Sequence, residues 1–82
     1  MPYVDQAARH ALDFSVRPRP GTAGELTYLL YSTVLRFTAA QGMRFETFAE
    51  AVGALEATKL EFYRRHVAPY EDRKLAENGD VA

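Results

Sequence analysis

The run Tyr63-Arg64-Arg65-His66 is the densest group of side chains in this chain that could do chemistry. Arginine is permanently charged and can hold a phosphate or carboxylate with two parallel hydrogen bonds. Tyr63 and Tyr70 offer flat rings on which a nucleobase could stack. Successive residues of a helix point about 100° apart, so the four do not share one face. The cluster predicts that Arg64 and Arg65 line a pocket for an anionic ligand such as a nucleotide.

The same arginines have a second explanation that needs no ligand. Glu61 precedes Arg64 by three residues and Arg65 by four, which is the spacing of ion pairs on a helix surface. Glu71 offers a further carboxylate nearby. Such exposed pairs contribute at most about 1 kcal/mol each. Both explanations stay open at this point.

Other polar residues define no reaction. Glu56 and Lys59 share a face with Tyr63, but a lysine beside a glutamate does acid-base chemistry only when its pKa is well shifted, and a solvated ion pair explains both. His66 near a helix end is explained by the helix dipole. The sequence has no glycine-rich phosphate loop, nucleophile elbow or zinc-hydrolase helix. We therefore predict no enzyme, no catalytic residue, no metal site and no cofactor.

Length and composition point to self-association. A chain of 82 residues forms one domain at most and buries only about 60% of its unfolded surface, so its core is marginal. Without cysteine it has no disulfide, and its two histidines match no metal spacing. A homodimer or larger oligomer is what remains to stabilise it. The net charge of -1 disfavours duplex nucleic acid as a partner.

The expected surroundings are aqueous and reducing. No apolar run approaches the roughly 20 residues of a membrane span, and no signal peptide is visible. The absence of cysteine fits the same setting. We expect a cytoplasmic protein with no membrane contact.

Start and stop signals divide the first half of the chain. Asp5 is a plausible N-cap for a short helix at about 5–14. The linker 15–21 contains Arg-Pro-Arg-Pro-Gly, which cannot be helical. Thr22, followed three residues later by Glu25, matches a capping box that opens a helix at about 22–41. Gly42 is a suitable stop.

The second half reads as a long helix and a short one. Thr47 with Glu50 repeats the capping-box pattern, for a helix at about 46–67. Pro69 should end or kink this helix and start a short one at about 69–78, which stops at Gly79. We predict an all-α fold, a single helical domain over 1–82 with three to four helices, a long helical hairpin, and assembly as a helical-bundle oligomer.

Two features bear on that assembly. The helix at about 22–41 is apolar over much of its circumference, so it needs cover on more than one side. Its apolar residues are Leu26, Tyr28, Leu29, Leu30, Tyr31, Val34, Leu35 and Phe37. Ala49, Gly53 and Ala57 form a strip of small side chains at intervals of four residues. A glycine there implies close approach of another helix, either within the monomer or between subunits.

Several segments resemble a family of short prokaryotic and phage proteins of unknown function. The most specific is KLEFYRRHVAPYEDRKLAENGDV at 59–81. The start MPY, GELTYLL at 24–30 and VGALEATKLE at 52–61 are similar too. The resemblance implies no chemistry. Its occurrence in phages implies, as context, a role in phage–host conflict or phage physiology. It adds Tyr28 to the candidate ligand-binding residues, which are then Tyr28, Glu56, Lys59, Tyr63, Arg64, Arg65 and Tyr70.

Two classes of function follow as hypotheses. In the first, a non-enzymatic oligomer sequesters a small anionic signal such as a nucleotide, in a pocket closed by a neighbouring chain. In the second, the chain is a protein-interaction module that binds a host or phage protein. A nucleic-acid-associated factor is a third alternative, against which the near-neutral charge counts.

Overall fold

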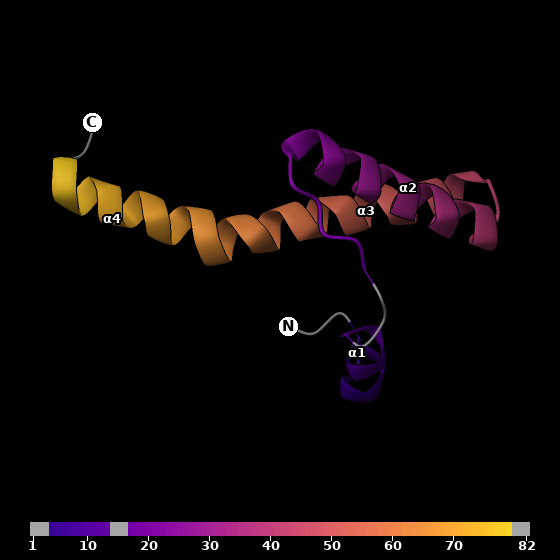
Figure 1. The fold of residues 1–82 in the computed structure, drawn as a ribbon. Helices are drawn as coiled ribbons and strands as arrows, with labels where there is room; N and C mark the ends of the chain where they lie inside the picture. Colours follow the sequence, from indigo (N-terminus) through magenta and orange to yellow (C-terminus); the bar gives the residue numbers. More distant parts are fainter. Residues whose placement is uncertain (1–3, 14–16, 80–82) are drawn as a thin grey trace. The chain divides into compact units, whose positions relative to one another are not determined.

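The computed structural model describes residues 4–13 and 17–79, and these residues form helices and no strand (Figure 1). The all-α prediction is confirmed for this part of the chain. The chain divides into two compact units, residues 1–30 and 31–82. Each unit is described by itself below.

In the first unit, two helix starts are capped as the sequence predicts. Helix α1 (Gln6–Asp13) follows Asp5, whose Oδ1 accepts a hydrogen bond from the Ala8 N–H at 2.8 Å. Helix α2 (Ala23–Gln41) follows Thr22, whose Oγ1 accepts from the Glu25 N–H at 3.1 Å. The Glu25 carboxylate accepts in return from the Gly21 N–H at 2.7 Å, one residue before the cap. Side chains thus satisfy backbone donors that a helix start leaves without partners.

In the second unit, the chain reverses direction directly after α2 (Figure 1). Gly42 has a φ of 113°, and its N–H donates to the Thr38 carbonyl at 2.8 Å. A Cβ at this position would lie 2.6 Å from Nη1 of Arg44, whose guanidinium donates to the Gln41 carbonyl at 3.1 Å. Gly42 therefore stops α2 as predicted, because another residue would be strained there.

Helix α3 (Phe45–Phe62) begins two residues before Thr47, so the second predicted capping box is wrong. The extended residue at its start is Arg44, which makes no capping bond with its side chain. Thr47 lies inside the first turn and is fully buried, and its Oγ1 has no hydrogen-bond partner. The tight turn brings this position under cover, so burial overrides the local capping pattern.

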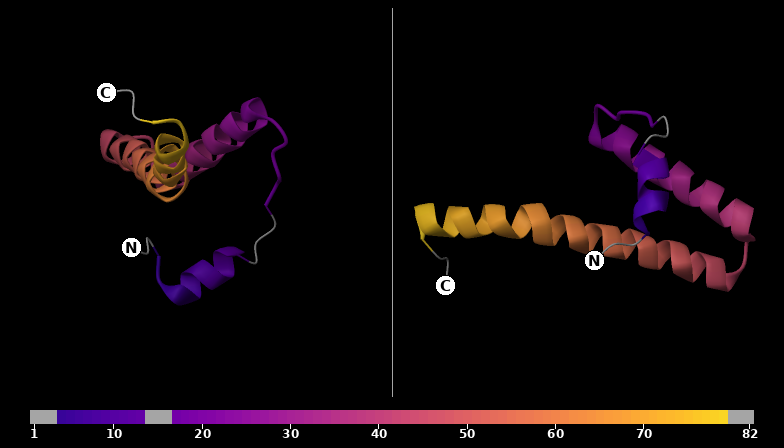
Figure 2. Two further views of the ribbon diagram at one scale, coloured as in Figure 1. Left: turned by 90° about the vertical axis from the view of Figure 1, so that its left-hand side faces the viewer. Right: turned by 90° about the horizontal axis from the view of Figure 1, so that it is seen from below.

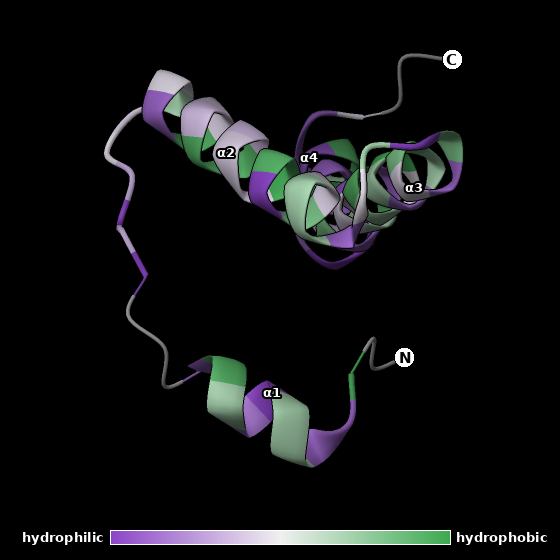
Figure 3. Cartoon of the chain, turned by 90° about the vertical axis from the view of Figure 1, so that its right-hand side faces the viewer, coloured by the Kyte–Doolittle hydropathy of each residue, from purple (hydrophilic) through white to green (hydrophobic). Residues whose placement is uncertain are grey.

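Burial in the second unit is confined to small side chains near the turn. Thr38, Thr47 and Ala51 are buried, and Ala51 is the buried hydrophobic residue of the part of the chain that the structure describes. Large apolar side chains remain exposed on α3, among them Phe45 at 80% and Val52 at 66%. Hydrophobic residues accordingly show along α3 in Figure 3. Among the described residues, α2 and α3 thus bury small side chains at their turn and leave the large apolar ones at least partly exposed.

The sequence predicts that the long helix ends or kinks near Pro69, whereas in the structure α3 already ends at Phe62. A π-helical segment (Tyr63–Val67) joins α3 to helix α4 (Ala68–Asn78), and the three follow one another along one line (Figure 2). The Ala68 N–H donates to the Tyr63 carbonyl, five residues back instead of four. Pro69, which has no N–H, then falls in the first turn of α4, where none is needed. Gly79 stops α4 with a φ of 83°, as predicted.

Gly53 has no neighbouring atom within 4 Å of the position a Cβ would take. Close packing within the monomer, one of the two explanations for this glycine, is therefore wrong for the described residues. A contact between subunits stays a prediction.

Candidate functional site

Arg64 and Arg65 lie at the start of the π segment and both bind the carboxylate of Glu61. Nη2 of Arg64 lies 2.9 Å from Glu61 Oε1, and Nε of Arg65 lies 2.6 Å from the same oxygen. Nε of Arg64 reaches the other oxygen at 3.2 Å. These hydrogen bonds hold the pKa of the Glu61 carboxyl at about 2, well below its ordinary value of 4.5. The structure therefore contains the ion pairs of the explanation without a ligand.

The two arginines still form a positive group. One carboxylate balances two guanidinium charges, so the three side chains keep a net charge of about +1. The arginine side chains are 65% and 59% exposed, whereas Glu61 is 25% exposed. The guanidinium groups therefore cover the carboxylate and present their outer edges to solvent. An anion could approach them there.

Tyr63 bridges the π segment to α4. Its hydroxyl donates to Oε1 of Glu71 at 2.5 Å, eight residues further along the chain. The hydrogen bond to Glu71 and the charge of this carboxylate raise the pKa of Tyr63 above its ordinary value of 10.0. The hydroxyl of Tyr63, which was predicted to border the ligand site, is therefore already hydrogen-bonded, while its ring is half exposed.

Tyr70 lies on α4 among its own cationic neighbours. The guanidinium carbon of Arg73 lies 5.8 Å from the ring centroid and Nζ of Lys74 lies 5.6 Å from it, both within the range of cation–π contacts. An open hollow of about 320 Å³ lies beside it, lined by Tyr70, Glu71, Lys74, Leu75, Asn78 and Gly79. No arginine of the predicted site lines this hollow.

Glu56 and Lys59 form the solvated pair that the sequence suggests. Lys59 Nζ lies 3.5 Å from Glu56 Oε1, and both side chains are more than half exposed. Such a pair contributes little to stability.

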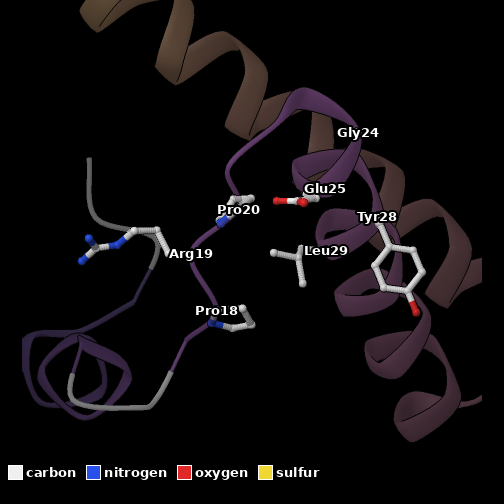
Figure 4. Close-up of a pocket in the computed structure, with 7 residues that line it drawn as sticks. All are labelled: Pro18, Arg19, Pro20, Gly24, Glu25, Tyr28 and Leu29. Carbon is white, nitrogen blue, oxygen red and sulfur yellow. The ribbon is translucent and has the colours of Figure 1, made fainter.

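Tyr28 belongs to the first unit and lines a different hollow (Figure 4). This open hollow of about 360 Å³ lies where the proline-rich segment passes the first turns of α2, and its lining is Pro18, Arg19, Pro20, Gly24, Glu25, Tyr28 and Leu29. The side chains of Pro18, Pro20 and Leu29 face one another, whereas Arg19 points away. The hollow is apolar, and the Glu25 carboxylate near it is used by the helix cap.

The structure thus brings Arg64 and Arg65 together on Glu61, ties Tyr63 to Glu71 and leaves Tyr70 to α4. No group of histidine and acidic residues that could hold a metal occurs among residues 4–13 and 17–79. None of the described helices is long and apolar enough to cross a membrane.

A family model described as Domain of unknown function (DUF6899) matches residues 1–81. The chain belongs to this family. The match spans every segment that carried the resemblance to short uncharacterised proteins, so that prediction is confirmed at the level of the family. No curated protein and no solved structure matches the chain. Membership in the DUF6899 family brings no assigned reaction, ligand or partner, so function has to be argued from this chain's own residues.

Sequence reasoning missed the most extensive feature of the surface. Six residues of α3 follow one another at alternating intervals of three and four, and all six are exposed: Phe45, Phe48, Val52, Leu55, Lys59 and Phe62. We call this set the α3 seam. The spacing is visible in the sequence itself. Their exposure, however, is visible only in the structure.

Proposed function

We propose that this protein works as a non-enzymatic interaction module that binds another protein surface through the exposed apolar side chains of its helices. The observation that supports this proposal is the contrast between burial and exposure. Ala51 is the buried hydrophobic residue of the described chain, while aromatic side chains such as Phe45, Phe62 and Tyr28 are 80%, 60% and 72% exposed.

The energetics favour a covered state. Fully burying a side chain such as phenylalanine or leucine contributes about 1.5–3 kcal/mol. An isolated chain forgoes most of that contribution on α3, where several such side chains are exposed in series. Contiguous exposed apolar surface on a soluble domain marks a site of association. Covering this surface therefore supplies the stability that the chain's own interior does not.

The direct test replaces Phe45 by the photo-reactive amino acid benzoylphenylalanine, which resembles phenylalanine in shape. The whole chain is then expressed in its native cells. Illumination should give covalent protein adducts, because this side chain lies against a partner. The same residue at Glu50, also exposed on α3 but outside the α3 seam, is the control. Adducts identified by mass spectrometry only at Phe45 support the proposal. Equal yields at the two positions, or none, would contradict it.

A second candidate is the binding of an anionic ligand at Arg64 and Arg65. It is favoured by one observation, the two guanidinium groups that share a single carboxylate and remain largely exposed. Each charged hydrogen bond to a phosphate contributes about 1.5–3 kcal/mol, so losing one arginine should weaken binding by about ten- to a hundredfold. A signalling nucleotide is the ligand class that we propose, in the phage–host setting that the family resemblance implies.

Calorimetry with mono-, di- and cyclic nucleotides tests this candidate. The variants are Arg64→Ala and Arg65→Ala, with Arg36→Ala on the second unit's part of α2 as the matched control. Binding by the natural chain and the control, but not by the two variants, is the expected result. If the natural chain binds none of the nucleotides, the ligand hypothesis is wrong and the interaction module remains.

A further inference from the structure

The α3 seam has the period of a helix that packs against another helix. Its residues recur every 3.5 positions on average, the repeat at which apolar side chains stay on one line between two coiled helices. Thr47 and Ala51, the α3 residues that are buried near the turn, occupy the neighbouring face. The seam is therefore open to a further helix and is separate from the face that the turn already covers.

We propose that the occupant of the α3 seam is the same seam of a second copy of this chain, packed antiparallel about a two-fold axis. This inference rests on the proposed interaction function and names the partner. The six residues pair among themselves in this orientation: Phe45 lies opposite Phe62, Phe48 opposite Lys59, and Val52 opposite Leu55. No seam residue is left without a counterpart, and the axis passes between Val52 and Leu55.

Charge selects the orientation. In a parallel pair each residue meets its own copy, so Lys59 would face Lys59 within the interface, where two like charges repel. In the antiparallel pair Lys59 faces Phe48 of the partner subunit instead. A lysine over an aromatic ring is attractive, and its long stem can extend so that the ammonium stays in water. Glu56, 3.5 Å from Lys59 in the same chain, already offsets its charge.

The area is sufficient for a stable pair. The five apolar seam residues are 80%, 46%, 66%, 40% and 60% exposed, in chain order. At the usual size of such side chains they leave about 500 Å² uncovered. Two copies would then bury about 1,000 Å² through these side chains alone, which reaches the lower bound for a specific interface. A closed two-fold dimer is also the commonest symmetric assembly.

Mass and a matched pair of lysine variants test the dimer. Light scattering of the full chain at micromolar concentration should give twice the monomer mass. Val52→Lys places a charge at the centre of the interface and should weaken the dimer by about thirtyfold or more, the effect of a central interface residue. Glu50→Lys adds the same side chain outside the seam and should leave the dimer intact. A monomeric natural chain, or equal behaviour of both variants, overturns the inference.

Disulfide trapping tests the orientation, because the chain has no cysteine of its own. Phe45→Cys and Phe62→Cys are prepared separately and then mixed and oxidised. The antiparallel seam predicts a disulfide between the two variants in the mixture and none when either is oxidised alone. Phe45→Cys linked to itself indicates a parallel pair, and a dimer without any link indicates another surface. Either result overturns the proposal.

The two proposals fail in different ways. If the natural chain is monomeric but benzoylphenylalanine at Phe45 links to a different protein, the self-association is wrong while the interaction function stands. If the mass is monomeric and no protein is linked at Phe45, both are wrong.

Discussion

Near the turn, α2 and α3 bury Thr38, Thr47 and Ala51, whereas the π segment and α4 bury no side chain completely. In the π segment and α4, side chains pair with neighbours along the chain, such as Arg64 and Arg65 with Glu61 and Tyr63 with Glu71. The first region depends on the fit of small side chains and the second on hydrogen bonds and charge. The two regions should therefore respond to different perturbations.

The largest expected effect is overpacking near the turn. Ala51→Leu inserts three carbons where Ala51 is only 5% exposed, and should lower the free energy of unfolding by about 1–3 kcal/mol. Chemical denaturation monitored by circular dichroism measures the free energy of unfolding. Hydrogen exchange should show reduced protection in α3 and at the end of α2. Ala54→Leu, at an exposed position of α3, is the control. A loss confined to α4 would contradict the division into two regions.

Thr47→Val should have the opposite sign. It removes a buried hydroxyl without a hydrogen-bond partner and keeps the branched shape, so the unfolding free energy should rise by about 1–2 kcal/mol. Thr58→Val is matched, because the Thr58 hydroxyl is exposed and donates to the Ala54 carbonyl at 2.7 Å. That variant should change stability by less than about 0.5 kcal/mol. Equal changes in the unfolding free energy of the two variants would show that water reaches the Thr47 hydroxyl.

Acid should weaken the second region selectively. Because the pKa of Glu61 is lowered from 4.5 to about 2 in the folded chain, its contribution is complete above pH 4.5 and is lost as the pH falls through 2. Glu61→Gln lacks this contribution, so the stability difference between the natural chain and the variant should shrink between pH 4.5 and 2. Acid titrations of both chains measure it. A constant difference over this range would mean that the arginines do not hold Glu61 in solution.

The smallest effect concerns Tyr63. Its pKa is raised by Glu71, so the neutral phenol is favoured by folding, and the contribution is present below pH 10.0 and lost as the pH rises through the folded value. Glu71→Gln should return the pKa towards 10.0. The ultraviolet titration of each chain is compared with that of the same chain carrying Tyr63→Phe. The difference isolates the signal of Tyr63 from the other tyrosines, of which the chain holds five in all. Identical titrations would show that the Tyr63–Glu71 bond is broken in water.

Local signals in the sequence predicted the helices well and the contacts less well. Asp5, Thr22 and Gly42 act through neighbours within four residues, so their roles follow from sequence spacing. Thr47 carries an equally good local pattern, but burial next to the turn decides its place, and burial depends on the chain's path.

The candidate site shows the same limit. The spacing of Glu61 to the two arginines predicted their ion pairs, and these are present. The bond of Tyr63 to Glu71 spans the π segment, where the usual helical period fails, so no spacing rule indicates it. Whether an anion binds at Arg64 and Arg65, and which partner covers α3, depends on molecules outside the chain.

The π segment also sets the direction in which α4 presents its side chains. A turn closed five residues back holds one residue more than an α-helical turn, so every later side chain emerges about 100° behind the direction in which an unbroken α-helix would place it. Removing a single residue between Tyr63 and Val67 would restore the regular α-helical turn and leave Tyr70 and Lys74 on about the side they now occupy. The length of this one turn thus determines which side chains of α4 lie in line with those of α3.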